Sequence, residues 1–267
     1  MNRFQTLKYP FFIFLFCILV SGFQLDAETY REQLQDGLNL SYRHWNTERQ
    51  EFTGFTHQKF KQEDYQGQQS ILETQINIKP EGKETRRKSL WYELNSGKPL
   101  KYLEEDLEEN IHITNSYQRR KVITSLRQGG KNIKFEVELK DEPSVSFELL
   151  LPFLRKNLDQ IQNNDEFLFT LYIPALAIEL EDSALPRSMS LVRMCVRQEQ
   201  TITWESKLGD RKAVWLEIFP DSMMLRTLLP KKKSHFRFLL ELDPPNHILQ
   251  FEEGGNVYTL TFLKSSE

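Results

Sequence analysis

The chain has 267 residues, of which 38 are acidic and 35 basic, so its formal net charge is −3 at pH 7. Hydrophobic residues make up 39% and aromatic residues 12%, which excludes a disordered chain and supplies enough large side chains for a substantial core. The charge balance offers no general attraction to nucleic acid, so we expect no nucleic-acid partner.

The first 27 residues have the order of a secretory signal. Two basic residues precede an apolar run over residues 11–20, and small residues follow it. The run is shorter than the ~20 apolar residues that span a bilayer. We therefore expect a signal peptide over 1–27, cleaved after Ala27 or after Gly22. The chain would then be exported, to the periplasm or the outer membrane of a bacterium. An uncleaved N-terminal membrane anchor is the alternative.

Strands dominate the sequence after residue 37, because apolar and polar residues alternate with a period of two. Such strands bury one face and expose the other to solvent. Short turn signals separate them, which predicts an antiparallel meander. The apolar sets are Leu72, Thr74, Ile76 and Ile78; Ile133, Phe135, Val137 and Leu139; Phe236, Phe238, Leu240 and Leu242; and Tyr258, Leu260 and Phe262. The turn signals are Ser96-Gly97, Gly129-Gly130, Gly209-Asp210 and Gly254-Gly255-Asn256.

Several charge runs interrupt this pattern. Basic triplets stand at 86–88, 119–121 and 231–233, and five acidic residues lie within 104–109. The acidic run suits a solvated loop or short turn better than a calcium site, because the spacing and glycine of an EF-hand are missing. The triplets are interpreted as soluble hairpin ends. If pairing brought the first two together, they would instead contact anionic headgroups.

One amphipathic helix is predicted near 144–163. Leu151, Leu154, Leu158 and Ile161 recur on one helical face, and Pro152 is tolerated in a first turn. A short helix over 28–35 is a further expectation. The segment 166–180 is apolar on both faces, so both faces must be covered, either by the sheet and the helix or by a bound hydrophobic molecule.

Cysteine offers neither a disulfide nor a nucleophile. Cys17 lies in the signal and Cys195 is the remaining thiol, so we expect no internal disulfide and no disulfide-linked partner. Cys195 stands in a strand-like apolar run without a neighbouring base. We therefore expect a small buried side chain rather than a reactive thiolate.

Taken together, the patterns predict a mainly β (α+β) protein with one β-rich domain over 28–267. A long curved antiparallel sheet or half-barrel would wrap the 144–163 helix. The order of features resembles the bacterial envelope proteins of domain of unknown function 3108. Six segments carry the resemblance, namely 94–102, 117–122, 146–154, 213–217, 238–242 and 248–252. It implies a shape similar to the periplasmic half-barrel carriers of lipids and lipoproteins, and it supplies no catalytic residues.

Motifs for catalysis and metal binding are missing from the sequence. The five histidines form no short-spaced ligand pair, and no Gly-x-Ser-x-Gly, Ser-x-x-Lys or phosphate-binding glycine loop occurs. We therefore expect no enzyme, metal or cofactor; an enzyme with dispersed acid–base residues is the least favoured alternative.

Two binding hypotheses remain. The first is a carrier that holds a lipid or other amphiphile in an apolar concavity. Its ligand-lining residues would be Phe167, Phe169, Leu171, Ile173, Trp215 and Phe238. The second is a structural or assembly factor that presents its sheet to another envelope protein.

Overall fold

The computed structural model describes residues 36–118, 120–139, 143–174, 176–177, 187–228 and 235–264. The expected signal peptide and the expected helix over 28–35 lie outside these residues. The first eight strands are β1 (Asn39–Asn46), β2 (Glu51–Tyr65), β3 (Gln68–Ile78), β4 (Glu84–Glu93), β5 (Pro99–Asp106), β6 (Ile111–Gln118), β7 (Lys121–Gln128) and β8 (Lys131–Glu138). The others are β9 (Ser144–Ser146), β10 (Phe167–Tyr172), β11 (Leu191–Trp204), β12 (Arg211–Pro220), β13 (Phe236–Glu241), β14 (Ile248–Glu253) and β15 (Asn256–Lys264). The helical segments are η1 (Phe147–Leu149), α2 (Leu150–Lys156), α3 (Leu158–Asn163), η2 (Arg187–Ser190) and α5 (Met223–Leu228).

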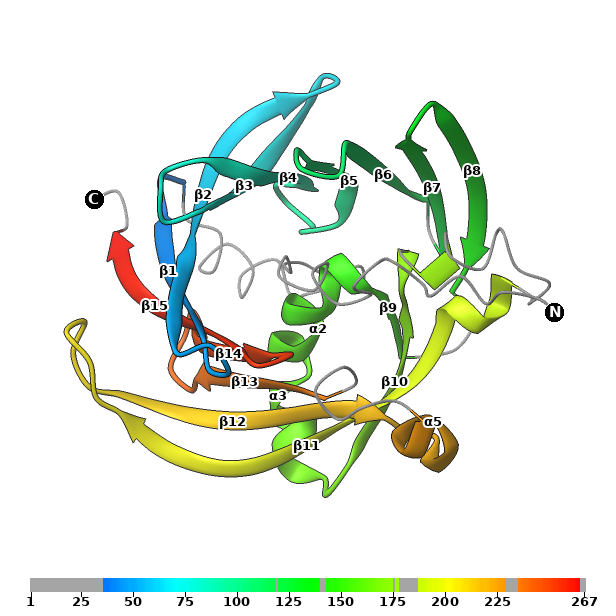
Figure 1. The fold of residues 1–267 in the computed structure, drawn as a ribbon. Coiled ribbons are helices and arrows are strands. Elements are labelled where there is room, and N and C mark those ends of the chain that lie inside the picture. Colours follow the sequence, from blue (N-terminus) through cyan, green and yellow to red (C-terminus); the bar gives the residue numbers. More distant parts are fainter. Residues whose placement is uncertain are drawn as a thin grey trace, which may run out of the picture.

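The fifteen strands belong to one sheet, in the order β8-β7-β6-β5-β4-β3-β2-β1-β15-β14-β13-β12-β11-β10-β9 (Figure 1). Neighbouring strands pair antiparallel, except that β9 runs parallel to β10. The prediction of a mainly β, largely antiparallel sheet is confirmed.

Each of the four predicted turn signals lies between consecutive strands. In two of these turns, paired glycines supply the backbone conformation that a tight hairpin needs. Gly129 and Gly130 join β7 to β8 with φ values of 56° and 82°, and Gly254 and Gly255 join β14 to β15 with 55° and 83°. A two-residue turn with positive φ at both positions matches the twist of the strands, and glycine adopts it without a steric penalty.

The helical prediction for 144–163 is corrected by the structure. The first three residues form β9, because their backbone pairs with β10, a contact that local periodicity does not report. The remainder forms η1, α2 and α3. Asn157 separates α2 from α3, and its side-chain amide donates to the Phe153 carbonyl over 2.7 Å. The predicted apolar face itself is present, since Leu151, Leu154, Leu158 and Ile161 are all buried.

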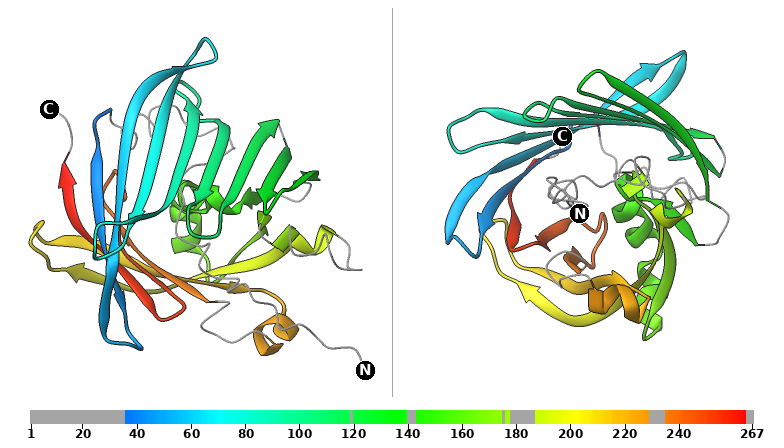
Figure 2. Two further views of the ribbon diagram at one scale, coloured as in Figure 1. Left: turned by 45° about the horizontal axis from the view of Figure 1, so that its top comes forward. Right: turned by 45° about the vertical axis from the view of Figure 1, so that its right-hand side comes forward.

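The sheet curls around α2 and α3, and its two ends overlap instead of pairing (Figure 2). The hydroxyl groups of Thr124 on β7 and Tyr172 on β10 lie 2.9 Å apart. Tyr172 also packs in one buried cluster with Val122, Phe135 and Val137 of β7 and β8. Side chains therefore close the curled sheet where the backbone does not.

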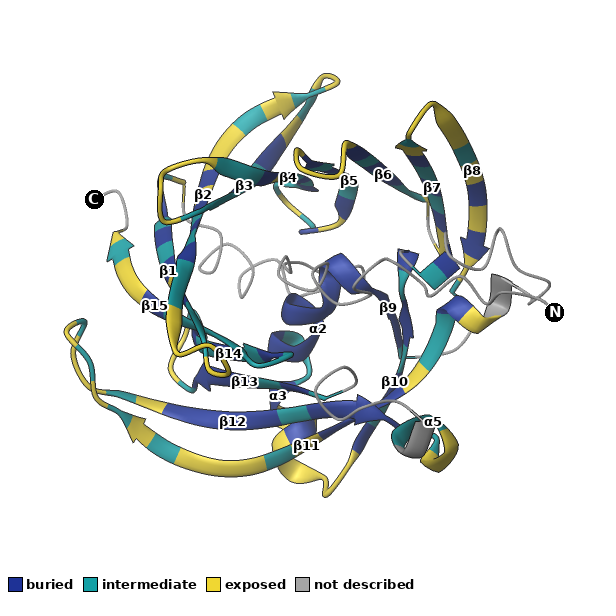
Figure 3. Ribbon diagram, viewed as in Figure 1, coloured by how far each residue is buried: buried dark blue, intermediate teal, exposed yellow. Residues whose placement is uncertain are grey.

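Burial follows the predicted faces on some strands and reverses them on another (Figure 3). Phe135 and Val137 on β8, and Phe236 and Phe238 on β13, are buried as expected. On β3 the prediction is wrong, because Leu72, Thr74, Ile76 and Ile78 are only half-buried. The buried residues of that strand are Ser70, Ile71, Glu73 and Gln75. The interior beside β3 is therefore partly polar.

Candidate functional site

The inner face of the sheet changes from aromatic to polar along one cross-strand row. Phe238, Phe251 and Tyr258 are register neighbours on β13, β14 and β15, and their rings stack with centroids 4.7 and 5.3 Å apart. His44 on β1 continues the row, with its ring edge-on to Tyr258 at 4.6 Å. Beyond His44 the row becomes hydrogen-bonded: Thr56 contacts His44 Nε2 at 2.8 Å and donates to Asn77 Oδ1 at 2.8 Å.

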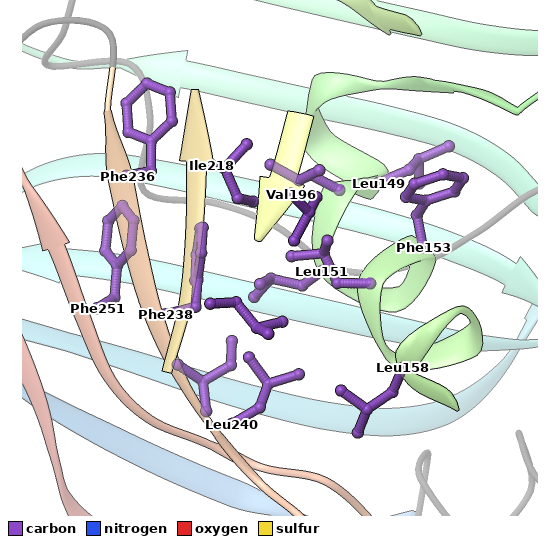
Figure 4. Close-up of a cluster of buried hydrophobic side chains, with 14 of the residues drawn as sticks. Leu149, Leu151, Phe153, Leu158, Val196, Ile218, Phe236, Phe238, Leu240 and Phe251 are labelled. Atoms are coloured by element: carbon purple, nitrogen blue, oxygen red, sulfur yellow. The ribbon is translucent and has the colours of Figure 1, made fainter. Parts of the chain in front are cut away.

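The aromatic side of this interior faces the helical segment (Figure 4). Phe236, Phe238 and Phe251 of the sheet lie across from Leu151 and Phe153 of α2. All five side chains are buried in the same core cluster. Helices as short as α2 and α3 are not stable on their own and depend on tertiary packing. Burial of this apolar area, at about 25 cal/mol per Å², supplies that packing and holds them against the sheet.

Five of the six predicted ligand-lining residues are buried in that cluster, and Ile173 packs against it half-buried. They do not form one surface. Phe167 and Phe169 face α2, with their rings 6.0 and 5.0 Å from that of Phe153. Trp215 neighbours Leu216, the register partner of Phe238, so it points to the opposite face. There the Arg237 guanidinium covers its ring at 4.5 Å. Contact of these residues with a ligand remains a prediction.

The polar side of the interior contains a buried charge ladder across β4 and β5. Arg86 pairs in register with Asp106, and Lys88 with Glu104. Arg86 Nη2 lies 2.6 Å from Asp106 Oδ2, and its Nε lies 3.4 Å from Glu104 Oε1. Lys88 Nζ lies 3.3 Å from the same Glu104 oxygen. All four side chains are at most 8% exposed, so each charge depends on its neighbours rather than on water.

This ladder corrects two interpretations of the charge runs. The triplet 86–88 is not a hairpin end, because it lies within β4 and turns two of its cations inward. The acidic run is a solvated turn only from residue 107 onward, since Glu104 and Asp106 are buried. The first two triplets do not meet either: β4 pairs with β3 and β5, whereas Lys121 begins β7. The triplet 231–233 lies outside the described residues.

A buried carboxyl outside the ladder lies on β3. Glu73 accepts hydrogen bonds from Gln58 Nε2 at 2.7 Å, Gln75 Nε2 at 2.6 Å and the Tyr92 hydroxyl at 3.0 Å. Burial raises the pKa of Glu73 to about 7, although these hydrogen bonds and the charge of Arg155 act to lower it. Glu73 therefore exchanges its proton near neutral pH within a fully hydrogen-bonded setting.

Another buried carboxyl, that of Glu148, joins the helical segment to the sheet at the overlap. Glu148 of η1 accepts from Asn115 Nδ2 at 2.6 Å, from Ser146 Oγ at 2.7 Å and from the Tyr117 hydroxyl. Burial raises its pKa above the usual range, against the effect of the hydrogen bonds. Glu148 thus links β6 to the turn that follows β9, and it helps to hold the curled sheet closed.

Two buried histidines, His44 and His247, and the thiol of Cys195 are held in uncharged forms. Burial lowers the pKa values of His44 and His247 to about 3, and burial raises that of Cys195 to about 11. The prediction of a buried Cys195 is confirmed. Within the described ranges, no three His, Cys, Asp or Glu side chains gather as metal ligands would. The described interior is therefore lined by apolar side chains and hydrogen-bonded polar groups.

The charge ladder was missed from the sequence, although a signal for it was there. Arg86 and Asp106 each lie ten residues from Ser96, and Lys88 and Glu104 each lie eight residues from it. An antiparallel hairpin that turns near Ser96 must bring these residues opposite one another. Opposite charges at matching distances from a predicted turn therefore indicate a cross-strand ion-pair ladder.

No family model matches the chain, and no curated protein matches it in sequence. Among solved structures, it is similar to a β-barrel-like protein of domain of unknown function 1849 from Brucella abortus. That likeness has 9% identity and a TM-score of 0.51, over 88% of this chain and 99% of the other. A candidate lipoprotein of Parabacteroides distasonis is 8% identical, with a TM-score of 0.32, over 86% of this chain and 96% of that one. At such identity the first likeness shows a β-barrel-like fold alone, and the second carries no argument.

The resemblance to domain of unknown function 3108 is thus supported only at the coarser level of a β-barrel-like architecture. Among the described residues, no helix has the length and apolar character needed to cross a membrane.

Proposed function

We propose that this chain is a non-catalytic exported envelope protein that binds an amphiphile, such as a lipid, inside its curled sheet. The observation that carries the proposal is the row from Phe238 and Phe251 through Tyr258 to His44 and Thr56. Along it, one inner surface passes from stacked aromatic rings to hydrogen-bonded polar groups. An amphiphile has the same division between an apolar chain and a polar end.

Each part of this row suits one part of such a ligand. An acyl chain lying against the aromatic rings would be held by burial, at about 25 cal/mol per Å² of apolar area. Its polar end would face β1–β5, where the interior is lined with amides, hydroxyl groups and paired charges. The expected signal peptide over 1–27 is the reason for proposing the bacterial envelope as the compartment.

The proposal is tested by native mass spectrometry of protein extracted gently from the cell envelope. Wild-type protein is expected to carry a bound amphiphile. Leu151→Trp, which enlarges a side chain on the helix facing the aromatic wall, should carry much less. Leu72→Trp, on the half-buried outer face of β3, is the matched control and should carry the wild-type amount. Circular dichroism would check that each variant folds, and Leu151→Phe is a milder replacement if Leu151→Trp does not. Wild-type protein without bound amphiphile would contradict the proposal.

An assembly factor is the second candidate, and the outer face of β2 and β3 favours it. Phe55 and Ile78 are register partners on that face, and Ile76 follows on the same side of β3; all three are half-buried rather than covered. A protein partner would cover them. Crosslinking in intact cells that recovers one specific partner, and that Ile76→Lys abolishes, would favour this function over amphiphile binding.

A further inference from the structure

Five buried side-chain acceptor oxygens of the described residues lack a hydrogen-bond donor: those of Gln198 and Glu241 lie on β11 and β13, and the other three lie on β3, β5 and β14. Gln75, Lys88 and Glu104 are register neighbours on β3, β4 and β5. Oε1 of Gln75 and Oε1 of Glu104 both lack a hydrogen bond, and these residues are 6% and 3% exposed. Glu253, the last residue of β14, also lacks a hydrogen bond at its Oε1 and is 4% exposed. The charges of Lys88 and Arg86 act on the pKa of Glu253, so this carboxyl lies within electrostatic reach of both cations.

These atoms are not accounted for by their own neighbours. The amide nitrogen of Gln75 donates a hydrogen bond to Glu73 at 2.6 Å, and the other carboxylate oxygen of Glu104 accepts one from the Tyr102 hydroxyl at 2.6 Å. Glu104 Oε1 has ion contacts with Lys88 Nζ at 3.3 Å and with Arg86 Nε at 3.4 Å, and both are longer than a good charge-assisted hydrogen bond. Nine in ten or more buried polar groups in proteins are hydrogen-bonded. The open acceptors of Gln75 and Glu104 on either side of Lys88, with that of Glu253 within reach of its charge, therefore call for a donor-rich molecule.

The charges at this position decide the class of that molecule. Two cations, Arg86 and Lys88, are balanced by Glu104 and Asp106. Burial raises the pKa of Glu253 well above the usual range and favours its neutral form. A phosphate or carboxylate would lie against these acidic side chains, and a quaternary ammonium group has no hydrogen to donate. An uncharged hydroxyl group donates one hydrogen bond and accepts two, so it satisfies both an open acceptor and Lys88.

We infer that the Gln75–Lys88–Glu104 row and Glu253 form a site for an uncharged, hydroxyl-rich group, the sugar or glycerol end of an amphiphile. The hydroxyl groups donate to Oε1 of Gln75, Glu104 and Glu253 and accept from Lys88 Nζ. This inference rests on the proposed function, because it assigns the polar end of the same ligand to named residues. Such a site favours amphiphiles with hydroxyl-rich ends over others with the same acyl chain, a preference that burial of the acyl chain alone does not produce.

The test compares three amphiphiles with twelve-carbon chains below their critical micelle concentrations, by isothermal titration calorimetry on the full chain. Dodecyl maltoside presents a sugar, monolauroylglycerol presents a glycerol, and dodecylphosphocholine presents a charged group without donors. We expect at least one hydroxyl-rich ligand to bind about tenfold more tightly than dodecylphosphocholine, as about one or two extra hydrogen bonds provide. The comparison of the first two ligands distinguishes a sugar from a glycerol end.

Variants assign the preference to the site. Gln75→Met and Glu253→Met should each weaken binding of the preferred ligand about fivefold to tenfold and leave dodecylphosphocholine unaffected. Glu253→Gln keeps a carbonyl acceptor and should stay within about twofold of wild type, which guards against a merely structural effect of the methionine. Thr74→Val, on the outer face beside Gln75, is the matched control and should change neither affinity.

The outcomes separate the two proposals. Equal binding of all three ligands, with no effect of the variants, would show that water satisfies these acceptors; it would overturn this inference and leave amphiphile binding intact. Tighter binding of dodecylphosphocholine would overturn it as well. Absence of binding by every ligand would overturn the proposed function, and this inference with it.

Discussion

Replacing Arg86 should destabilise the fold far more than replacing its neighbour in the chain, Arg87. Arg86 lies inside the curled sheet, with its side chain 5% exposed and its Nη2 2.6 Å from Asp106. Arg86→Met leaves Asp106 without its cation and removes one of the two cations that contact Glu104. Breaking a buried pair from one side costs about 3–5 kcal/mol. A Coulomb attraction of about 4 kcal/mol at 4 Å and an effective dielectric of about 20 agrees with this range.

A double-mutant cycle isolates the pair from its surroundings. Asp106 Oδ1 also accepts the backbone N–H groups of Glu108 and Glu109 at 3.0 and 2.9 Å. Asp106→Asn therefore removes the charge while keeping an acceptor for that turn. We expect Arg86→Met and Asp106→Asn together to cost about 2–3 kcal/mol less than the sum of the single changes.

Urea unfolding, followed by circular dichroism, measures these free energies. Arg87→Met is the matched control, because Arg87 is 50% exposed and pairs with Glu84 at 3.0 Å, so its loss should cost less than about 1 kcal/mol. Equal costs for Arg86→Met and Arg87→Met, or simple additivity in the cycle, would refute the buried ladder.

Three further predictions concern other parts of the fold. Because the folded-state pKa of Glu73 is about 7 instead of 4.5, the folded chain binds more protons than the unfolded chain between these values. The contribution of Glu73 to stability is thus full below pH 4.5 and is lost as the pH rises to 7. Glu73→Gln should make the unfolding free energy fall less steeply over that window than in wild type; identical pH profiles would disprove this. Glu148→Gln places an amide among three donors and should cost about 1–3 kcal/mol in urea unfolding, whereas no change would argue against its role at the overlap. Gly54→Ala, where φ is +139° and a Cβ would lie 2.2 Å from the Ile78 carbonyl oxygen, should lower the melting temperature much more than Gly67→Ala, which meets no atom within 4 Å. Equal shifts would mean that Gly54 is not constrained.

The β architecture was predictable because its signals are local. Alternation over 131–139 and 236–242, with the glycine turns between strands, was enough to indicate long antiparallel strands. The break of the helical segment was not predictable, since the strand character of 144–146 comes from pairing with β10, far along the chain. Asn157 ends α2 through its own side chain, and the apolar periodicity continues across it.

The interior was predicted only in part, because alternation identifies two faces but not which one is inside. On β3 the apolar set of Leu72, Ile76 and Ile78 was the natural inner face, yet Glu73 and Gln75 are the buried ones. Their burial depends on hydrogen-bond donors and charged residues on β2, β4 and β5. These partners can be identified only once the register of the strands is known. Trp215 and Phe238 are both predicted to line the ligand site, although their register places them on opposite faces.

Photo-crosslinking locates the ligand most directly. A dodecyl amphiphile with a diazirine at the end of its chain would be irradiated with the full chain, and the modified peptides would be mapped by mass spectrometry. Amphiphile binding inside the curled sheet predicts adducts on β13, β14 and α2, around Phe238, Phe251 and Leu151. Adducts confined to the outer face of β2 and β3, around Phe55 and Ile76, would contradict it.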